Sequence, residues 1–185
     1  CLKAYLMLED GSVYEGTARG DFKETACDIV FNTSMTGYVE ILTDPSYAGQ
    51  GVVMTYPMIG NYGISREDFE SERLQPSAFI VHELSSDPSN FRCTDTIENL
   101  LKEYNIPCIS GVDTRAVVKK LRESGTMRGV LTSDIGDRER LMDVIKSFRQ
   151  IDLVGSVTAK QTKVYGEENT GAEIALMDFG TKRNI

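Results

Sequence analysis

The first seventeen residues constrain the fold most, because two strand-like runs flank a tight-turn signal. Residues 4–8 are apolar, residues 13–17 alternate between apolar and polar side chains, and Glu9-Asp10-Gly11 lies between them. An Asp-Gly pair in this position is the strongest short-range signal of a hairpin, since glycine takes the positive φ that the turn requires. The chain is therefore predicted to open as a β-hairpin.

Further strands are expected where β-branched and aromatic residues are dense. Five short runs have this character: residues 28–32, 52–56, 78–83, 108–112 and 128–132. The last two alternate with helical runs, so two strand-to-helix units follow one another. This order predicts an α/β fold that is mostly β in its first part and alternates helix and strand afterwards.

Three helices are predicted from capping residues and buried stripes. Asp95 and Glu98 form a capping-box-like pair ahead of a run that Pro107 ends. Asp113 can cap residues 114–123, which Gly125 ends, and Asp137 can cap a third helix. The third helix carries apolar residues at helical spacing: Leu141, Val144, Ile145 and Phe148. These stripes are interpreted as core rather than as cofactor contacts.

The end of the chain is expected to cross a domain boundary. Residues 1–150 are assigned to one domain, residues 151–171 to a polar linker with weak β stretches at 156–158 and 163–165, and residues 172–185 to the start of another domain. Within that start, residues 174–177 are apolar and resemble a first buried strand whose sheet is missing. Residues 174–185 are therefore expected to be poorly ordered or to pack opportunistically against the domain or a neighbour.

Composition argues against some classes of partner. The chain is 41% hydrophobic and 26% charged, which is ordinary for a soluble globular protein, and its formal net charge is −8. Nucleic-acid binding needs clustered Lys and Arg to neutralise phosphates. No apolar run approaches the roughly 20 residues that span a bilayer, and the first residues lack the apolar stretch of a signal peptide. We expect a cytoplasmic protein that binds neither nucleic acid nor membrane.

Candidate catalytic side chains are few. Cys1, Cys27, Cys93 and Cys108 are widely spaced without a C-x-x-C pair, which favours reduced, mostly buried thiols over a zinc or redox site. His82 lies in a strand-like run, where a lone histidine is usually structural. Pairing of His82 with a cysteine in space stays open. No metal or cofactor is expected in this chain.

Two local motifs have both a functional and a structural interpretation. Asp178-Phe179-Gly180 matches the magnesium-binding triplet of protein kinases, but the other kinase motifs are missing and that interpretation fails. Asp113-Thr114-Arg115 follows a strand and opens a helix, a place where backbone N–H groups can bind anions. A plain helix cap is the favoured interpretation of this second motif.

Residues 31–47 form the most functional-looking segment. They gather hydroxyls, an amide, two carboxylates and three aromatic rings without a core periodicity. This pattern favours a loop-borne binding surface over a helix or strand interior. Asp44-Pro45-Ser46, or Gly60-Asn61-Tyr62-Gly63 further along, could also be a plain turn. The residues by themselves predict a binding or interaction domain with no identifiable active site.

Taken together, the segments resemble the small subunit of carbamoyl phosphate synthetase. The residues that carry the resemblance are Leu8-Glu9-Asp10-Gly11, the run 31–47, Thr55-Tyr56-Pro57, Ile59-Gly60-Asn61, Ser89-Asn90-Phe91-Arg92, Asp113-Thr114-Arg115, Asp178-Phe179-Gly180 and Lys182-Arg183-Asn184-Ile185. The run 31–47 is the most specific of them. Val39 and Met58 depart from residues that are often Gln and His in the family, and these departures affect only the flanks.

The resemblance implies a layered β/β/α N-terminal domain that ends at the first strand of a class I glutamine amidotransferase domain. In the family, the small subunit hydrolyses glutamine and passes ammonia to a large subunit, which binds ATP and Mg. There, bicarbonate, ammonia and ATP become carbamoyl phosphate for pyrimidine and arginine synthesis. The implied partners are therefore the large subunit and glutamine. The catalytic cysteine, histidine and glutamate belong to the second domain, so this chain alone is expected to be inactive.

One ligand contact follows from the resemblance. The serine of the Asp-Pro-Ser-Tyr segment reaches the glutamine site in the family, so Ser46 is expected to bind glutamine through its hydroxyl. Ser34 and Asp44 are expected at the domain interface or the ammonia passage. A free-standing interaction or small-molecule-binding module without an enzymatic role is the alternative. A fused pyrimidine-pathway polypeptide is a third possibility.

Overall fold

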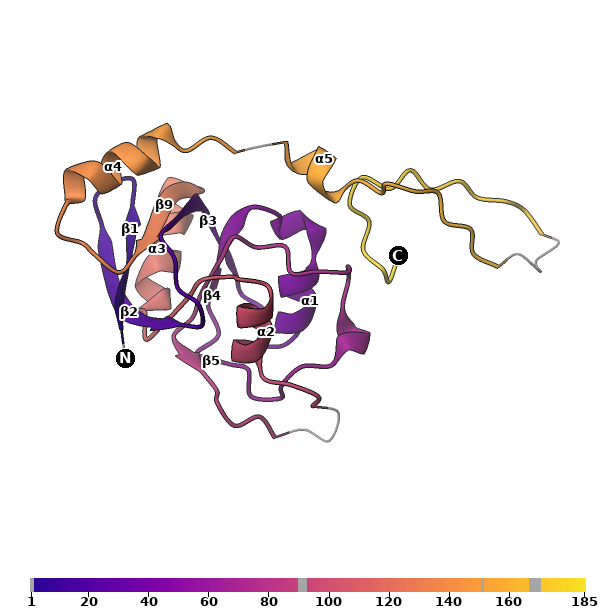
Figure 1. The fold of residues 1–185 in the computed structure, drawn as a ribbon, viewed down its shortest axis with the longest axis horizontal. Helices are drawn as coiled ribbons and strands as arrows, with labels where there is room; N and C mark the ends of the chain where they lie inside the picture. Colours follow the sequence, from indigo (N-terminus) through magenta and orange to yellow (C-terminus); the bar gives the residue numbers. More distant parts are fainter. Residues whose placement is uncertain (1, 90–92, 151, 167–170) are drawn as a thin grey trace.

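The computed structural model describes residues 2–89, 93–150, 152–166 and 171–185. Within these ranges, seven strands close into one barrel in the order β1-β2-β8-β6-β4-β3-β9 (Figure 1). Their bounds are β1 Lys3–Leu8, β2 Val13–Arg19, β3 Thr25–Asn32, β4 Gln50–Met54, β6 Ala78–Ile80, β8 Cys108–Ser110 and β9 Met127–Thr132. A separate parallel pair joins β5 (Met58–Ile59) to β7 (Glu83–Leu84). The predicted α/β class is confirmed.

The predicted hairpin forms between β1 and β2. The two strands pair antiparallel, with Met7 opposite Val13. The turn between them uses Gly11 at φ 85° and an Asp10 carboxylate that accepts the Ser12 N–H at 2.9 Å. Local turn chemistry is therefore enough to set this register.

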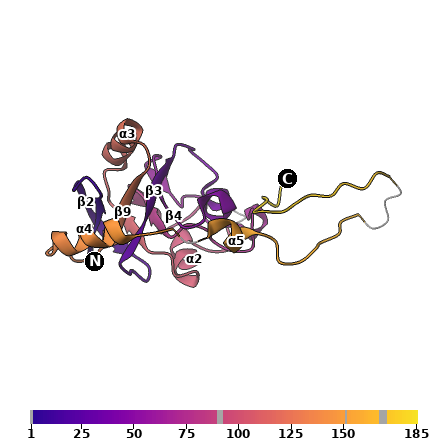
Figure 2. The same ribbon diagram turned by 90° about the horizontal axis from the view of Figure 1, so that it is seen from above.

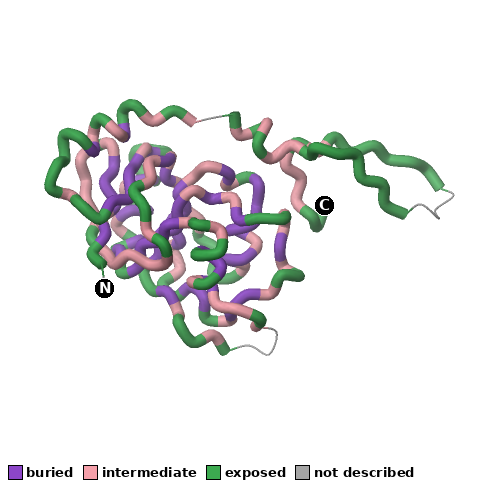
Figure 3. The backbone as a smooth tube through the Cα atoms, viewed as in Figure 1, coloured by how far each residue is buried: buried purple, intermediate pink, exposed green. Residues whose placement is uncertain are grey.

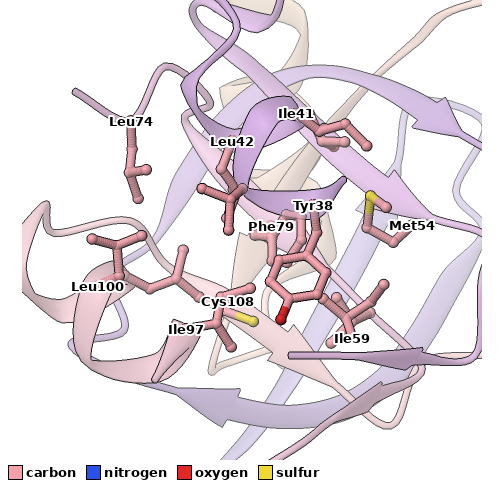
Figure 4. Close-up of a cluster of buried hydrophobic side chains, with 14 of the residues drawn as sticks. Tyr38, Ile41, Leu42, Met54, Ile59, Leu74, Phe79, Ile97, Leu100 and Cys108 are labelled. Atoms are coloured by element: carbon pink, nitrogen blue, oxygen red, sulfur yellow. The ribbon is translucent and has the colours of Figure 1, made fainter. Parts of the chain in front are cut away.

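Strands β3, β4, β6 and β8 run parallel to one another and bury both faces of the sheet. Side chains alternate along them, so Val53 and Ile80 point into the barrel core while Val52 and Phe79 point to a second core outside it. The outer core lies under α1 (Tyr38–Thr43) and α2 (Ile97–Glu103) (Figure 4). These two helices thus cover the outward-facing side chains of the parallel strands.

The caps of α3 (Thr114–Ser124) and α4 (Arg138–Ser147) are confirmed. Asp113 accepts the Ala116 N–H at 3.0 Å, and Asp137 accepts the Arg140 N–H at 2.9 Å. Gly125 ends α3 with φ 81°. The favoured interpretation of the Asp113 turn, a plain helix cap, is therefore confirmed.

The cap predicted for α2 is wrong by one residue. Thr96, not Asp95, is the N-cap, and its hydroxyl accepts the Asn99 N–H at 3.3 Å. Asp95 instead accepts hydrogen bonds from the Thr96 N–H at 2.7 Å and the Asn99 amide at 2.8 Å. Asp95 and Thr96 are both residue types that can cap a helix, and the sequence alone does not distinguish them. The Asp95 carboxylate lies just before the helix and binds the Thr96 N–H and the Asn99 side chain.

The prediction that residues 31–47 form a loop is wrong for their central part. Helix α1 occupies Tyr38–Thr43 and buries Tyr38, Val39 and Leu42 completely or almost so. Its N-cap, Gly37, is left-handed at φ 80° and provides no side-chain cap, so the usual start signal is missing. Five of the six residues of α1 are buried, so the helix lacks the exposed polar face that makes helical spacing visible in a sequence.

The C-terminal part differs from the expected weak strands. Ser156 and Val157 belong to a short helix, α5 (Leu153–Val157), and residues 163–165 and 174–177 are not in strands. Figures 1 and 2 show residues 160–166 running away from the body and residues 171–177 returning to it. Both stretches are exposed along their length (Figure 3), with Ile174 at 92%. A run that resembled a buried strand is therefore extended and solvent-exposed here.

The described ranges contain no helix with the length and apolar character needed to cross a membrane. Part of the family-motif stretch 89–92, namely residues 90–92, lies outside the described residues, as do Cys1, Ile151 and residues 167–170 of the expected linker.

Candidate functional site

The turn Asp44-Pro45-Ser46 is a rigid surface feature. Asp44 ends α1 and caps the short 3-10 helix Pro45–Tyr47, where its Oδ1 accepts the Ser46 N–H at 2.9 Å. Proline at the first helical position has a backbone angle that already suits the turn. Ser46 is exposed while Asp44 and Pro45 are buried. The fold therefore holds the Ser46 backbone fixed and presents its side chain to solvent.

Asp44 is held in its ionised form by the C-terminal segment. Its Oδ2 lies 2.8 Å from the Lys182 Nζ, and only 10% of the Asp44 side chain is exposed. Burial favours the neutral acid, but the Lys182 ammonium and the N–H and hydroxyl of Ser46 outweigh it, so the pKa of Asp44 lies below its ordinary value. The hydrogen bond to Asp44 in turn raises the pKa of Lys182.

The last residues of the chain pack beside this turn. Asp178 Oδ1 accepts the N–H groups of Gly180 at 2.9 Å and Thr181 at 2.7 Å, which folds the Asp178-Phe179-Gly180 motif into a tight turn. A Cβ on Gly180 would lie 3.2 Å from that of Pro45. The structure thus brings the residues around 44–46 and 178–185 together. Opportunistic packing, one of the two outcomes expected for the C-terminal segment, is observed for its second half.

Ser34 is linked to the same region through a side-chain amide. The Asn32 side-chain Oδ1 accepts the Ser34 N–H at 2.7 Å, and the Asn32 side-chain Nδ2 donates to the Tyr47 hydroxyl at 2.9 Å. Tyr47 directly follows Ser46. The exposed loop of Ser34 and the turn of Ser46 are therefore joined through one residue at the end of β3.

A stacked pair of tyrosines gives the Gly60-Asn61-Tyr62-Gly63 motif a role beyond that of a plain turn. The rings of Tyr38 and Tyr62 stack with centroids 4.2 Å apart. The Tyr62 hydroxyl accepts the N–H of Gly37 at 2.6 Å and of Tyr38 at 3.3 Å, and so caps α1 from another segment. Burial raises the pKa of both phenols. No local signal could have revealed this cap.

Two of the described cysteines, Cys27 and Cys108, are poor nucleophiles in their present environment. Burial raises the pKa of Cys27 and of Cys108 to about 12, so both remain protonated thiols. Cys93 is free and half-buried, and its thiol donates to the Asp95 carbonyl at 3.2 Å. His82 is exposed, with Nδ1 3.0 Å from the Val112 carbonyl, so this ring has a structural partner as expected. None of these contacts joins a cysteine to the histidine.

Two surface hollows lie away from the candidate residues. One, of about 330 Å³, is lined by Ile29, Val30, Phe31, Leu121, Gly125 and Thr126. The other, of about 590 Å³, is lined by Leu2, Ala18, Gly20, Asp21, Phe22, Lys23 and Asn105. Neither includes Ser34, Asp44 or Ser46. Across the described ranges, no cluster of three or more His, Cys, Asp or Glu side chains could hold a metal ion.

These features define an α/β barrel domain that presents a fixed serine on an open surface and keeps Cys27 and Cys108 as buried, protonated thiols. Residues 6–131 match the family described as carbamoyl-phosphate synthase small chain, CPSase domain. The chain therefore belongs to the carbamoyl-phosphate synthase small chain family.

Similar proteins span the entire chain. Carbamoyl phosphate synthase small chains of Caldanaerobacter subterraneus and Archaeoglobus fulgidus are each 47% identical over 100% of this chain, and that of Clostridium perfringens is 46% identical over 100%. The chain covers 49%, 52% and 52% of these relatives, so it spans about half of their length. A solved aminopeptidase from Aneurinibacillus aligns with 70% of this chain and with 30% of its own chain. The sequence identity is 15% and the TM-score is 0.41, so this likeness supports no inference.

Proposed function

We propose that this chain is the N-terminal part of a cytoplasmic small subunit of glutamine-dependent carbamoyl phosphate synthetase, in which it docks the large subunit and supplies one wall of the glutamine site. The observation that carries the proposal is the packing of residues 178–185 beside the Asp44-Pro45-Ser46 turn. The Lys182 to Asp44 ion pair, at 2.8 Å, joins the two segments directly. Residues 178–185 thus lie beside the turn that holds Ser46.

The proposed domain division follows the expectation from sequence. Residues 1–150 are the layered β/β/α domain, residues 151–171 the linker, and residues 172–185 the opening of the class I glutamine amidotransferase domain. Large apolar side chains at Ile174, Leu176 and Met177 are 92%, 64% and 76% exposed, which supports this division because such a run needs a sheet to cover it.

Ser46 is proposed to hydrogen-bond glutamine through its hydroxyl, which can both donate and accept. The cysteine nucleophile, its histidine and its glutamate would come from the second domain. Ser34 and Asp44 are assigned to the domain interface or the ammonia passage. Bicarbonate, ATP and Mg are assigned to the large subunit, which would complete the synthesis of carbamoyl phosphate.

Glutamate release from glutamine tests the proposal. The full-length subunit with its large partner should be active, the 185-residue chain should be inactive, and Ser46→Ala in the full complex should raise KM for glutamine about 10-fold, the effect of losing one substrate hydrogen bond. Ser147→Ala is a matched control, since that hydroxyl only bonds the Val144 carbonyl within α4. Turnover by the 185-residue chain would contradict the assignment of catalysis to the second domain.

A further inference from the structure

Glu70 is bound to the end of helix α1. It follows the short 3-10 helix Arg66–Asp68 and the buried residue Phe69. Its N–H donates to the Thr43 Oγ1 at 2.9 Å, and the same hydroxyl donates to the Val39 carbonyl at 2.9 Å. Thr43 has no exposed surface and directly precedes Asp44. The backbone of Glu70 is therefore fixed relative to the candidate turn.

Glu70 also binds the C-terminal segment through three acceptor atoms. Its backbone carbonyl accepts the Arg183 N–H at 2.8 Å. Its carboxylate accepts the Asn184 side-chain amide at 3.2 Å and the Asn184 N–H at 3.4 Å. These residues directly follow Lys182, the residue that pairs with Asp44. The contacts form a closed ring through Thr43, Glu70, residues 183–184, Lys182 and Asp44.

The ring of contacts reduces the entropy that Lys182 loses when it pairs with Asp44. A lysine side chain loses about 2 kcal/mol of rotamer entropy when it is fixed, which cancels much of the value of an ion pair. Lys182 remains 43% exposed, so solvent competes for its ammonium. Holding the next two residues in place limits where Lys182 can reach. A buried carboxylate such as Asp44 needs that cation nearby to remain charged and to keep accepting the Ser46 N–H.

We propose that Glu70 is a positioning residue for the glutamine site, acting through the Lys182 to Asp44 pair on the backbone of Ser46. This inference rests on the proposed function of Ser46. Glu70 touches neither Ser46 nor the side chain of Asp44 in any contact described above. Its role is to hold residues 183–184 in place, and so to keep the Lys182 ammonium beside Asp44.

Glu72 provides a matched control in the same loop. It pairs with Lys163 at 3.2 Å, and its side chain is 79% exposed. Lys163 belongs to the outward-running stretch and not to residues 178–185. Glu72→Ala therefore removes an acidic side chain and an ion pair from the same loop without touching the ring.

Hydrogen exchange followed by mass spectrometry on the full-length subunit tests the structural half of the proposal. Glu70→Ala should speed exchange of the Ser46 and Arg183 amides about 5- to 10-fold, the effect of weakening one hydrogen bond. Glu72→Ala should leave both unchanged. Asn184→Ala removes the side-chain amide contact but keeps the Asn184 N–H, so its effect should be no larger than that of Glu70→Ala. The double variant should add nothing to Glu70→Ala, because that substitution already removes both contacts to the carboxylate. Unchanged β9 exchange shows that the barrel is intact.

Steady-state kinetics on the complex with the large subunit test the functional half. Glu70→Ala should raise KM for glutamine about 5- to 10-fold and leave kcat within twofold. Glu70→Gln should recover most of the loss, since its amide oxygen can still accept from Asn184. Unchanged exchange at Ser46, or unchanged KM in an active enzyme, would overturn the proposal. An inactive wild-type complex would refute the proposed function instead, while the exchange result would still decide the link from Glu70 to Ser46.

Discussion

Lys182 and Asp44 are far apart in the sequence, and their Nζ and Oδ2 atoms lie 2.8 Å apart. The carboxylate is almost buried and the ammonium is nearly half exposed. Breaking such a pair leaves the less hydrated partner with the larger penalty, which is here the carboxylate. Through this pair, a change in the C-terminal segment alters the environment of Asp44, and Asp44 accepts the Ser46 N–H.

Lys182→Met should shift the acid limb of the stability curve. A carboxyl group whose folded pKa is depressed contributes stability above its unfolded pKa, and that stability is lost as pH falls through the folded pKa. The Asp44 pKa lies below the ordinary 3.8 in the folded protein. Without Lys182, burial raises it, so acid destabilisation should begin at higher pH, with a loss of about 1 kcal/mol at neutral pH.

Urea midpoints measured between about pH 3 and pH 7 check this prediction. Lys163→Met is the control, because Lys163 pairs with the highly exposed Glu72 and should contribute almost nothing. Superimposable curves for Lys182→Met and the unmodified protein would show that the pair does not control the ionisation of Asp44.

Tyr62→Phe should destabilise the protein by about 1 to 2 kcal/mol while keeping the ring stack. The substitution removes the hydroxyl that accepts the Gly37 N–H at 2.6 Å, and Gly37 has no other side-chain cap. An unsatisfied N–H at a helix start costs about the value of a lost cap. Thermal or urea unfolding measures the change. Tyr165→Phe, at a side chain that is 85% exposed, should be neutral, and equal stability of all three proteins would contradict the capping role.

The elements that were predicted correctly are specified by residues close to one another in sequence. The hairpin at Gly11 and the caps at Asp113 and Asp137 each depend on a side chain and a backbone group within three residues. Strand and helix positions therefore follow from local chemistry. Helix α1 was missed because its cap is the hydroxyl of Tyr62, which local patterns cannot supply.

The candidate site was predictable only in part for the same reason. A resemblance selected Ser46, Asp44 and Ser34, but no spacing indicated that Lys182 would pair with Asp44 or that Asn32 would link Ser34 to Tyr47. These contacts depend on how the barrel places segments that are far apart in sequence. The binding role of Ser46 itself stays a prediction.

Gly180→Ala should loosen residues 178–185 from the turn. Gly180 has φ 108°, and an added Cβ would lie 2.7 Å from the Val157 Cγ2 and 3.2 Å from the Pro45 Cβ. The Ala159 N–H, which donates to the Asp178 carbonyl at 3.1 Å, should exchange about 10-fold faster with solvent. Gly125→Ala is the control, because Gly125 has a comparable positive φ of 81° but no atom within 4 Å of the new Cβ. It therefore measures the effect of backbone strain without a steric clash. Unchanged exchange at Ala159 would show that the segment accommodates the methyl group.

Gly16→Ala should test how the barrel closes. Gly16 lies on β2 where that strand meets β8, and an added Cβ would be 2.5 Å from both the Ser110 carbonyl oxygen and the Ile109 Cγ2. A backbone atom cannot rotate away as a side chain can, so β2 and β8 must separate, at a cost of about 2 to 3 kcal/mol.

Because the β2 to β8 pairing joins the hairpin to the parallel strands, the loss of stability should be cooperative across the whole barrel. Gly171→Ala, with no atom within 4 Å of its new Cβ, should stay within about 0.5 kcal/mol. Urea unfolding of both variants measures the difference, and a Gly16→Ala protein as stable as Gly171→Ala would mean that the β2 to β8 contact is looser than the closed barrel requires.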